Sequence, residues 1–180
     1  MDKDKVMIEY LLSCPAINGN SLFFNYAEGS DDTNHFLTQA TDISKAKPFI
    51  DGSELKQYAF SIITYKSLGT QSVDKSNVES DENLDELSEV QSIIDWITEQ
   101  SEQRNYPNFG ENCQIDDMVC TTDKPVFTGV FQDSVGTPTA RYSMTINIDY
   151  LDTTKNEHIP YYETNEGFTS WLEQYIYLQK

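Results

Sequence analysis

Residues 138–150 read PTARYSMTINIDY, and this stretch decides the fold. From Ala140 onward, every second residue is apolar or aromatic, and the residues between them are polar or charged. Side chains alternate between the two faces of a strand, so the pattern predicts a strand with one face on a core and one in water. Such half-buried strands are typical of antiparallel sheets. The apolar positions are Ala140, Tyr142, Met144, Ile146, Ile148 and Tyr150.

Two further long elements are predicted upstream of this strand. Residues 54–67 carry apolar side chains on both faces, which is typical of a central strand. A helix is predicted from Ser80 to about Arg104, where apolar residues recur at spacings of three and four before Tyr106-Pro107 ends it. Its apolar stripe is Leu84, Leu87, Val90, Ile94 and Ile97, and its acidic face, expected to be solvated, is Asp85, Glu86, Glu89, Asp95 and Glu99.

Shorter elements complete the predicted order. Gly29 to Asp32 and Asp51-Gly52 are turn signals, and the first makes 34–40 the returning partner of the strand before it. The shorter elements are a helix at 2–13, strands at 21–28, 34–40, 46–50, 113–121 and 125–131, and a last helix at 164–178. The sequence therefore predicts an α+β fold, a mostly antiparallel twisted sheet with helices packed on one face, plus a C-terminal helix.

The composition restricts the class of protein. The chain has 180 residues, the length of one domain, with 12 Lys and Arg against 30 Asp and Glu, a net charge of −18. Such a charge argues against binding to nucleic acid or to an anionic membrane, because both need cations. Three cysteines at loose spacing (Cys14, Cys113 and Cys120) do not form a disulfide framework, so we expect free thiols and synthesis in a cytoplasm.

No catalytic constellation is apparent. His35 and His158 lack metal-ligand neighbours, and Ser53-x-x-Lys56 opens a strand, whereas the penicillin-recognising motif opens a helix. The acidic pairs Asp31-Asp32, Asp116-Asp117 and Glu86/Glu89 are interpreted as solvated surface. We therefore predict no enzyme activity, no catalytic residue, no cofactor and no metal. The lysines Lys45, Lys47, Lys56 and Lys66 form either one positive region that contacts an acidic neighbour or scattered solubilising charges.

Several stretches together resemble a known family, the tail-terminator or minor capsid proteins of tailed bacteriophages of Gram-positive hosts. The stretches are IEYLLSCPAINGN, LFFNYAE, KPFIDGSELKQYAFSIITYKSLG, SIIDWITEQSEQRNYPNFGENC and TARYSMTINIDYLD, within residues 5–150. The positions matching the family pattern are Asp51, Gly52, Leu55, Lys56, Gln57, Trp96, Gln103, Pro107, Gly110, Ala140, Arg141 and Tyr142. Residues 151–180 extend beyond the usual family member, so 1–150 is expected to be the terminator-like domain and 151–180 an extension containing the last helix.

The resemblance implies a structural protein of the virion tail, assembled in the bacterial cytoplasm. Such a protein forms a homo-oligomeric ring, expected to be a hexamer, that caps the head-proximal end of the tail tube. Its implied partners are the tail tube protein and the head connector or completion protein, with the tail sheath as a further candidate. DNA would pass through the bore without specific binding, and no membrane is involved.

Three alternatives to a terminator stay open: a head-completion, connector or other tube-end protein, a small hydrolase, and a generic bacterial interaction module. If the terminator reading holds, three regions are expected to form interfaces: the loop 68–81, the turn at Asp51-Gly52, and the last helix. The candidate interface residues are Lys45, Lys47, Asp51, Gly52, Ser72, Lys75, Phe168, Trp171 and Tyr175.

Overall fold

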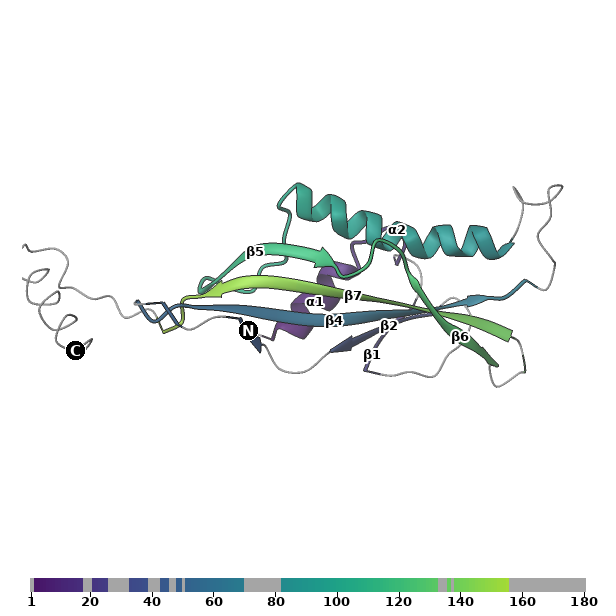
Figure 1. Ribbon diagram of the computed structural model, residues 1–180, viewed down its shortest axis with the longest axis horizontal. Helices are drawn as coiled ribbons and strands as arrows, with labels where there is room; N and C mark the ends of the chain where they lie inside the picture. The colour runs from purple at the N-terminus through teal and green to yellow at the C-terminus, as the bar shows by residue number, and fades with distance from the viewer. Residues whose placement is uncertain are drawn as a thin grey trace, which may run out of the picture.

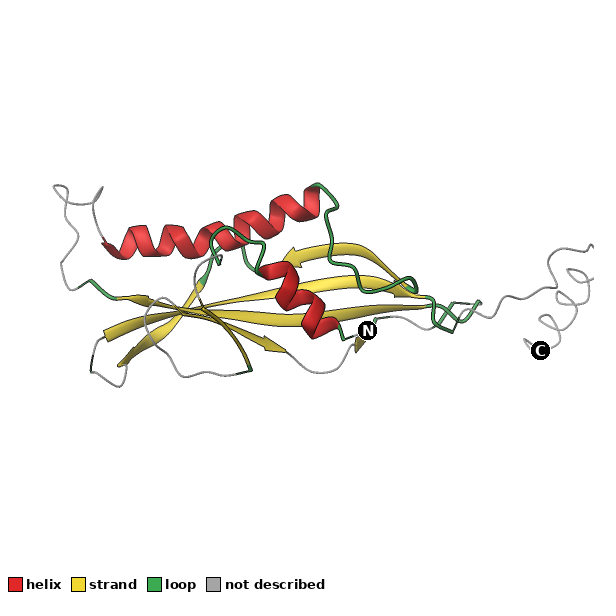
Figure 2. Ribbon diagram, turned by 180° about the vertical axis from the view of Figure 1, so that it is seen from behind, coloured by secondary structure: helices red, strands yellow, loops and turns green. Residues whose placement is uncertain are grey.

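The computed structural model describes residues 2–17, 21–25, 33–38, 43–45, 48–49, 51–69, 82–132, 136 and 138–155. Within these residues the chain is an α+β fold with two helices and one mixed, mostly antiparallel sheet (Figures 1 and 2). The elements are α1 (Lys3–Leu11), β1 (Ser21–Phe24), β2 (Thr33–Thr38), β3 (Ile43–Ser44), β4 (Glu54–Ser67), α2 (Glu82–Glu102), β5 (Cys113–Cys120), β6 (Val126–Gln132) and β7 (Pro138–Asp152). The predicted helix at 164–178 lies outside the described residues.

The two longest strands, β4 and β7, form the middle of the sheet. They run side by side along the long axis of the molecule and pair antiparallel from Glu54 opposite Asp152 to Ser67 opposite Thr139 (Figure 1). The strand order is β1-β2-β4-β7-β5, with β3 also on β4 and β6 also on β7. The predicted central position of residues 54–67 is confirmed.

One edge of the sheet is built from two strands in succession. β5 pairs with residues 146–152 of β7, and β6 pairs with residues 138–143, both antiparallel. The chain thus follows one side of β7 twice, with residues 121–125 between the two strands. Both strands were predicted, at 113–121 and 125–131, and their positions are confirmed.

The pairing of the first two strands corrects a prediction. β1 and β2 are parallel, with Phe23 opposite His35 and Phe24 opposite Phe36, so residues 33–38 do not return along β1 as expected. This pairing stacks the two opposed ring pairs at centroid distances of 5.2 and 5.8 Å. Turn signals mark where a strand ends, but packing of the side chains on both strands decides the direction of pairing.

The third short strand also differs from the prediction. It lies at Ile43–Ser44, and the described residues of 46–50, Pro48 and Phe49, are not in a strand. Phe49 belongs instead to the turn before β4, where its N–H donates to the Ser53 carbonyl at 2.8 Å. Pro48 has no N–H to give to a ladder, which disfavours strand pairing at this position.

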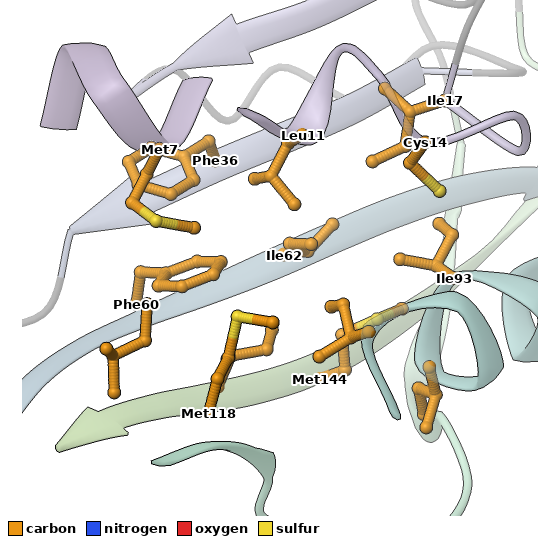
Figure 3. Close-up of a cluster of buried hydrophobic side chains, with 14 of the residues drawn as sticks. Met7, Leu11, Cys14, Ile17, Phe36, Phe60, Ile62, Ile93, Met118 and Met144 are labelled. Carbon is orange, nitrogen blue, oxygen red and sulfur yellow. The ribbon is translucent and has the colours of Figure 1, made fainter. Parts of the chain in front are cut away.

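The core lies on one face of the sheet. Ile62 pairs with Met144 and Phe60 with Ile146, and all four side chains are at most 1 % exposed. The predicted alternation in β7 is confirmed, because every second residue from Ala140 to Tyr150 is buried. Both helices add buried side chains to the same cluster, as Figure 3 shows for part of it: Met7 and Leu11 from α1, and Val90, Ile93, Ile94 and Ile97 from α2.

Polar contacts fix the helices on the sheet. In α1, Lys3 Nζ donates to the Tyr150 hydroxyl, and the Tyr58 hydroxyl donates to Asp4, each at 2.5 Å. In α2, Glu86 and Glu89 bind the buried ammonium of Lys66 at 3.0 and 2.5 Å. Two of the acidic residues expected to be only solvated therefore attach this helix to β4.

The ends of the helices follow local rules. Asp2 caps α1 by accepting from the Asp4 N–H, as carboxylates at N-caps do. α2 ends at Glu102, two residues before the predicted limit, and Arg104 then has a positive φ of 54°. Neither helix in the described part of the chain is long and apolar enough to span a bilayer.

Candidate interaction surface

Four of the exposed large apolar side chains of the sheet are on β6. Val126, Phe127, Val130 and Phe131 are 47, 54, 51 and 42 % exposed. Among the described residues β6 pairs with β7 alone, so it is an edge strand of the described sheet. The strand VFTGVFQ contains no charged residue, although the whole chain has a net charge of −18. An uncharged apolar edge strand is a template for pairing with another chain.

A β-bulge distributes these side chains over both faces. The register of β6 on β7 shifts between Phe127 and Gly129, and the Thr128 hydroxyl donates to the Arg141 carbonyl there. Before the bulge, Phe127 lies opposite Tyr142 on the helix-covered face. After it, Phe131 lies opposite Thr139 on the other face. Each face of β6 therefore presents one valine and one phenylalanine. In a regular strand, both valines would lie on one face and both phenylalanines on the other.

A groove lies between α2 and β5, with a volume of 380 Å³. Asp95, Glu102, Asp117 and Asp123 contribute carboxylates to its lining. The only thiol in the lining is that of Cys120, and burial raises its pKa to about 12. This thiol stays protonated at neutral pH, so the groove contains no activated cysteine nucleophile.

The predicted turn at Asp51-Gly52 is confirmed and is tightly built. The Asp51 carboxylate accepts from the Ser53 hydroxyl at 2.6 Å and from the Ser53 N–H at 3.0 Å, and these bonds lower the pKa of Asp51. Gly52 has φ +83°, and an added Cβ would lie 2.3 Å from the Lys155 carbonyl oxygen. The turn therefore requires glycine both for its backbone conformation and for the close approach of residue 155.

The described lysines of the expected positive region are paired inside the domain. Lys45 binds Asp149 at 2.5 Å, Lys56 binds Asp152 at 2.6 Å, and Lys66 binds Glu86 and Glu89. Hydrogen bonding to Asp152 raises the pKa of Lys56. Burial tends to raise the pKa of Asp152, but hydrogen bonds from Lys56 and Thr154 outweigh it and lower that pKa. These three cations therefore neutralise neighbouring acids and do not form a free positive patch.

The other predicted interface residues fall outside the described part of the chain. They are Lys47, Ser72, Lys75, Phe168, Trp171 and Tyr175. Of the predicted set, the structure brings Lys45 to β7 through Asp149, and it places Asp51 and Gly52 in the turn before β4. The sequence predicted a strand at 125–131, but it did not identify β6 as an interaction surface. The feature that could have identified this surface is the absence of charged residues from Val126 to Gln132. A buried strand can have the same composition.

His35 and Ser53, which were considered for chemistry, have structural roles, whereas His158, Asp31 and Asp32 lie outside the described residues. His35 is fully buried, with its ring between Phe23 and Tyr65 at centroid distances of 5.2 Å from each. Ser53 lies directly before β4 and donates its hydroxyl to Asp51. This hydrogen bond gives Ser53 the role of a turn residue and not that of a nucleophile. In the described residues, no three His, Cys, Asp or Glu side chains are grouped so that they would hold a metal.

No protein-family model matches the chain, and no curated protein matches it. The function proposed for it therefore rests on its own residues and on the resemblance of its motifs.

Proposed function

We propose that the chain is a structural tail terminator of a tailed bacteriophage. It would form a ring, expected to be a hexamer, on the head-proximal end of the tail tube, and it would join the tube to the head connector. The observation that carries the proposal is β6, an uncharged strand with apolar side chains on both faces at the edge of a strongly acidic protein. Such an edge fits a protein that acts through subunit contacts.

The central strip of the helix-free face is compatible with the passage of DNA. Its centre is formed by Ala59 and Ser61 of β4 and by Ser143, Thr145 and Asn147 of β7, none of which is charged. The hydroxyls of Ser61 and Thr145 lie 2.9 Å apart and bond to each other. This central strip contains no cation that would neutralise phosphate, although Arg141, opposite Tyr65, lies beside it on the same face.

The positions that carry the family resemblance are spread along the framework of the fold. Asp51 and Gly52 make the turn before β4, Trp96 and Gln103 lie in or just after α2, and Ala140 to Tyr142 open the alternating part of β7. Gly110 lies before β5 with φ 103°, another backbone position suited to glycine. The motif therefore supports a likeness of framework and contributes no chemical group to a reaction.

The alternatives make different demands on the molecule. A head-completion or other tube-end protein would use the same edge strand but would bind a different end of the tail. A small hydrolase would use the groove between α2 and β5, where the four carboxylates are accompanied by a protonated thiol. We prefer a structural role, because β6 is an uncharged edge strand with four exposed apolar side chains and the thiol in the groove is not activated.

The experiment combines native mass with a capping assay. Light scattering across a concentration series should give an oligomer, and electron microscopy should show rings. In a phage that encodes the chain, an amber mutation in its gene should give tail tubes of uncontrolled length and heads without tails. Adding the purified protein to such tubes should cap one end. Normal tails without the protein would refute the terminator function, and tail-less heads with tubes of normal length would favour the head-completion alternative.

A further inference from the structure

β6 has the composition of an interior strand in an edge position. Strands whose two faces are both covered by other layers are apolar on both faces, whereas edge strands usually carry charges that prevent pairing. β6 has one half-exposed valine and one half-exposed phenylalanine on each face and no charge. Its side chains would be covered if another strand extended the sheet beyond it and brought its own side chains over both faces.

The charge of the chain favours a second copy as that strand. Two molecules that each carry −18 repel, so they can associate closely only where their surfaces are uncharged. A basic peptide would find no acidic group on β6 and would be drawn to the carboxylates between α2 and β5. The opposite edge of the sheet, β1, is also uncharged, and Phe24 on it is 46 % exposed. Each copy therefore carries two uncharged edges with exposed phenylalanine.

The directions of the strands fit a closed ring. β6 runs antiparallel to β7, β7 to β4, and β4 to β2, while β1 runs parallel to β2. β6 and β1 therefore run in opposite senses within one subunit. Rotation about a ring axis preserves the sense of each strand along that axis, so β6 of one copy meets β1 of the next in antiparallel orientation. Antiparallel pairing is the more stable of the two ladders.

We propose that β6 of one copy pairs with β1 of the next copy, so that the sheets of neighbouring subunits continue into one another around the ring. The proposal rests on the ring of the proposed function and names its contact. Because two different edges meet, the contact is heterologous, and it closes only when the last copy returns to the first. The four residues of β1 set the length of the shared ladder.

The test uses one charge on each edge and a matched control. Val130→Glu alters β6, Phe24→Glu alters β1, and Leu12→Glu places the same charge on a 47 % exposed leucine at the end of α1. Circular dichroism and thermal unfolding first establish that each variant is folded. Light scattering should then show monomers for Val130→Glu and Phe24→Glu at concentrations where wild type and Leu12→Glu are oligomers. Burial of an unpaired carboxylate should raise the dissociation constant by about 100-fold or more.

Mixing the two edge variants gives the decisive result. Val130→Glu keeps a normal β1 and Phe24→Glu keeps a normal β6, so one intact contact remains between them. The mixture should form a species of twice the 20.6 kDa chain mass and nothing larger. Loss of assembly in Val130→Glu with normal assembly in Phe24→Glu would overturn the proposal in favour of β6 pairing with itself or with another surface.

Wild-type protein gives a test without any substitution. Hydrogen exchange of the amides in residues 126–132 and 21–24 should slow as the concentration rises through assembly, while exchange in α1 stays constant. Rings that form without protection of either strand would overturn the strand contact and leave the terminator function standing. A wild-type chain that stays monomeric at all concentrations would also overturn it, and the tail-capping assay would then decide the function separately.

Discussion

Replacement of Gly52 by alanine tests the most closely packed turn of the domain. Two costs are expected. The positive φ of +83° disfavours alanine by about 1 kcal/mol. The new Cβ would also lie 2.3 Å from the Lys155 carbonyl oxygen, so residues 153–155 must move. That movement strains the Thr153 N–H bond to the Asn112 carbonyl, at a further cost of about 1–2 kcal/mol, and it displaces Lys155 from its ion pair with Glu54.

One effect opposes these costs. Alanine reduces the entropy of the unfolded chain relative to glycine, which stabilises the protein by about 0.4–1 kcal/mol. The net loss for Gly52→Ala is then about 2 kcal/mol. For a chain of this length, that corresponds to a melting temperature about 4–8 °C lower. Urea unfolding monitored by circular dichroism measures the free energy, and calorimetry measures the melting temperature.

Gly136→Ala is the matched control for this prediction. Gly136 has φ +89°, almost that of Gly52, but an added Cβ would meet nothing within 4 Å. It carries the conformational cost and the unfolded-state gain without the clash, so a change of less than about 1 kcal/mol is expected. Equal losses for the two variants would refute the close approach of Lys155 to the turn as a source of stability.

Three other substitutions or measurements test the ion pairs and the thiol. Lys66→Met should destabilise the protein by about 1–3 kcal/mol in urea unfolding. This loss is smaller than that for a fully buried ion pair, because Glu89 is 66 % exposed. Adding Glu86→Gln to the Lys66→Met variant should recover part of the lost stability. Asp152→Asn should cost about 1 kcal/mol at pH 7, because the folded pKa of Asp152 is lowered. The deficit should shrink as the pH falls from about 4, the pKa of an unfolded aspartate, toward the lowered pKa of the folded protein, and a deficit that stays constant from pH 7 to pH 2 would contradict the ion pair. Alkylation of Cys120 at pH 8 should be roughly a thousandfold slower than that of an unfolded cysteine, as followed by peptide mass spectrometry, since its pKa is about 12; rapid labelling would disprove its burial.

Much of the fold follows from local pattern. The alternation of Ala140 to Tyr150 predicted β7, and the spacing of Val90, Ile94 and Ile97 predicted α2, because each element must present its apolar side chains to one layer. The turn at Asp51-Gly52 followed from residue types that accept its backbone angles. In each case the information lies within a few turns or residues of the element itself.

Much less of the candidate interaction surface could be predicted from the sequence. Lys45, Lys56 and Lys66 were weighed as one positive region, but their partners are Asp149, Asp152, and Glu86 with Glu89, which the chain brings close only on folding. An uncharged stretch such as 126–132 has the same local pattern whether it is buried between layers or exposed at an edge. Only the arrangement of neighbouring strands distinguishes the two.

The sequence by itself determined where the described helices and long strands lie and which faces of them are apolar, because periodicity is a local property of the chain. The tertiary structure decided that β1 pairs parallel to β2, that Lys45, Lys56 and Lys66 neutralise acids of their own domain, and that β6 lies at an edge of the described sheet. Those outcomes depend on which distant segments compete for the same strand or charge. That competition is resolved by packing of the whole domain, and no short stretch of sequence records it.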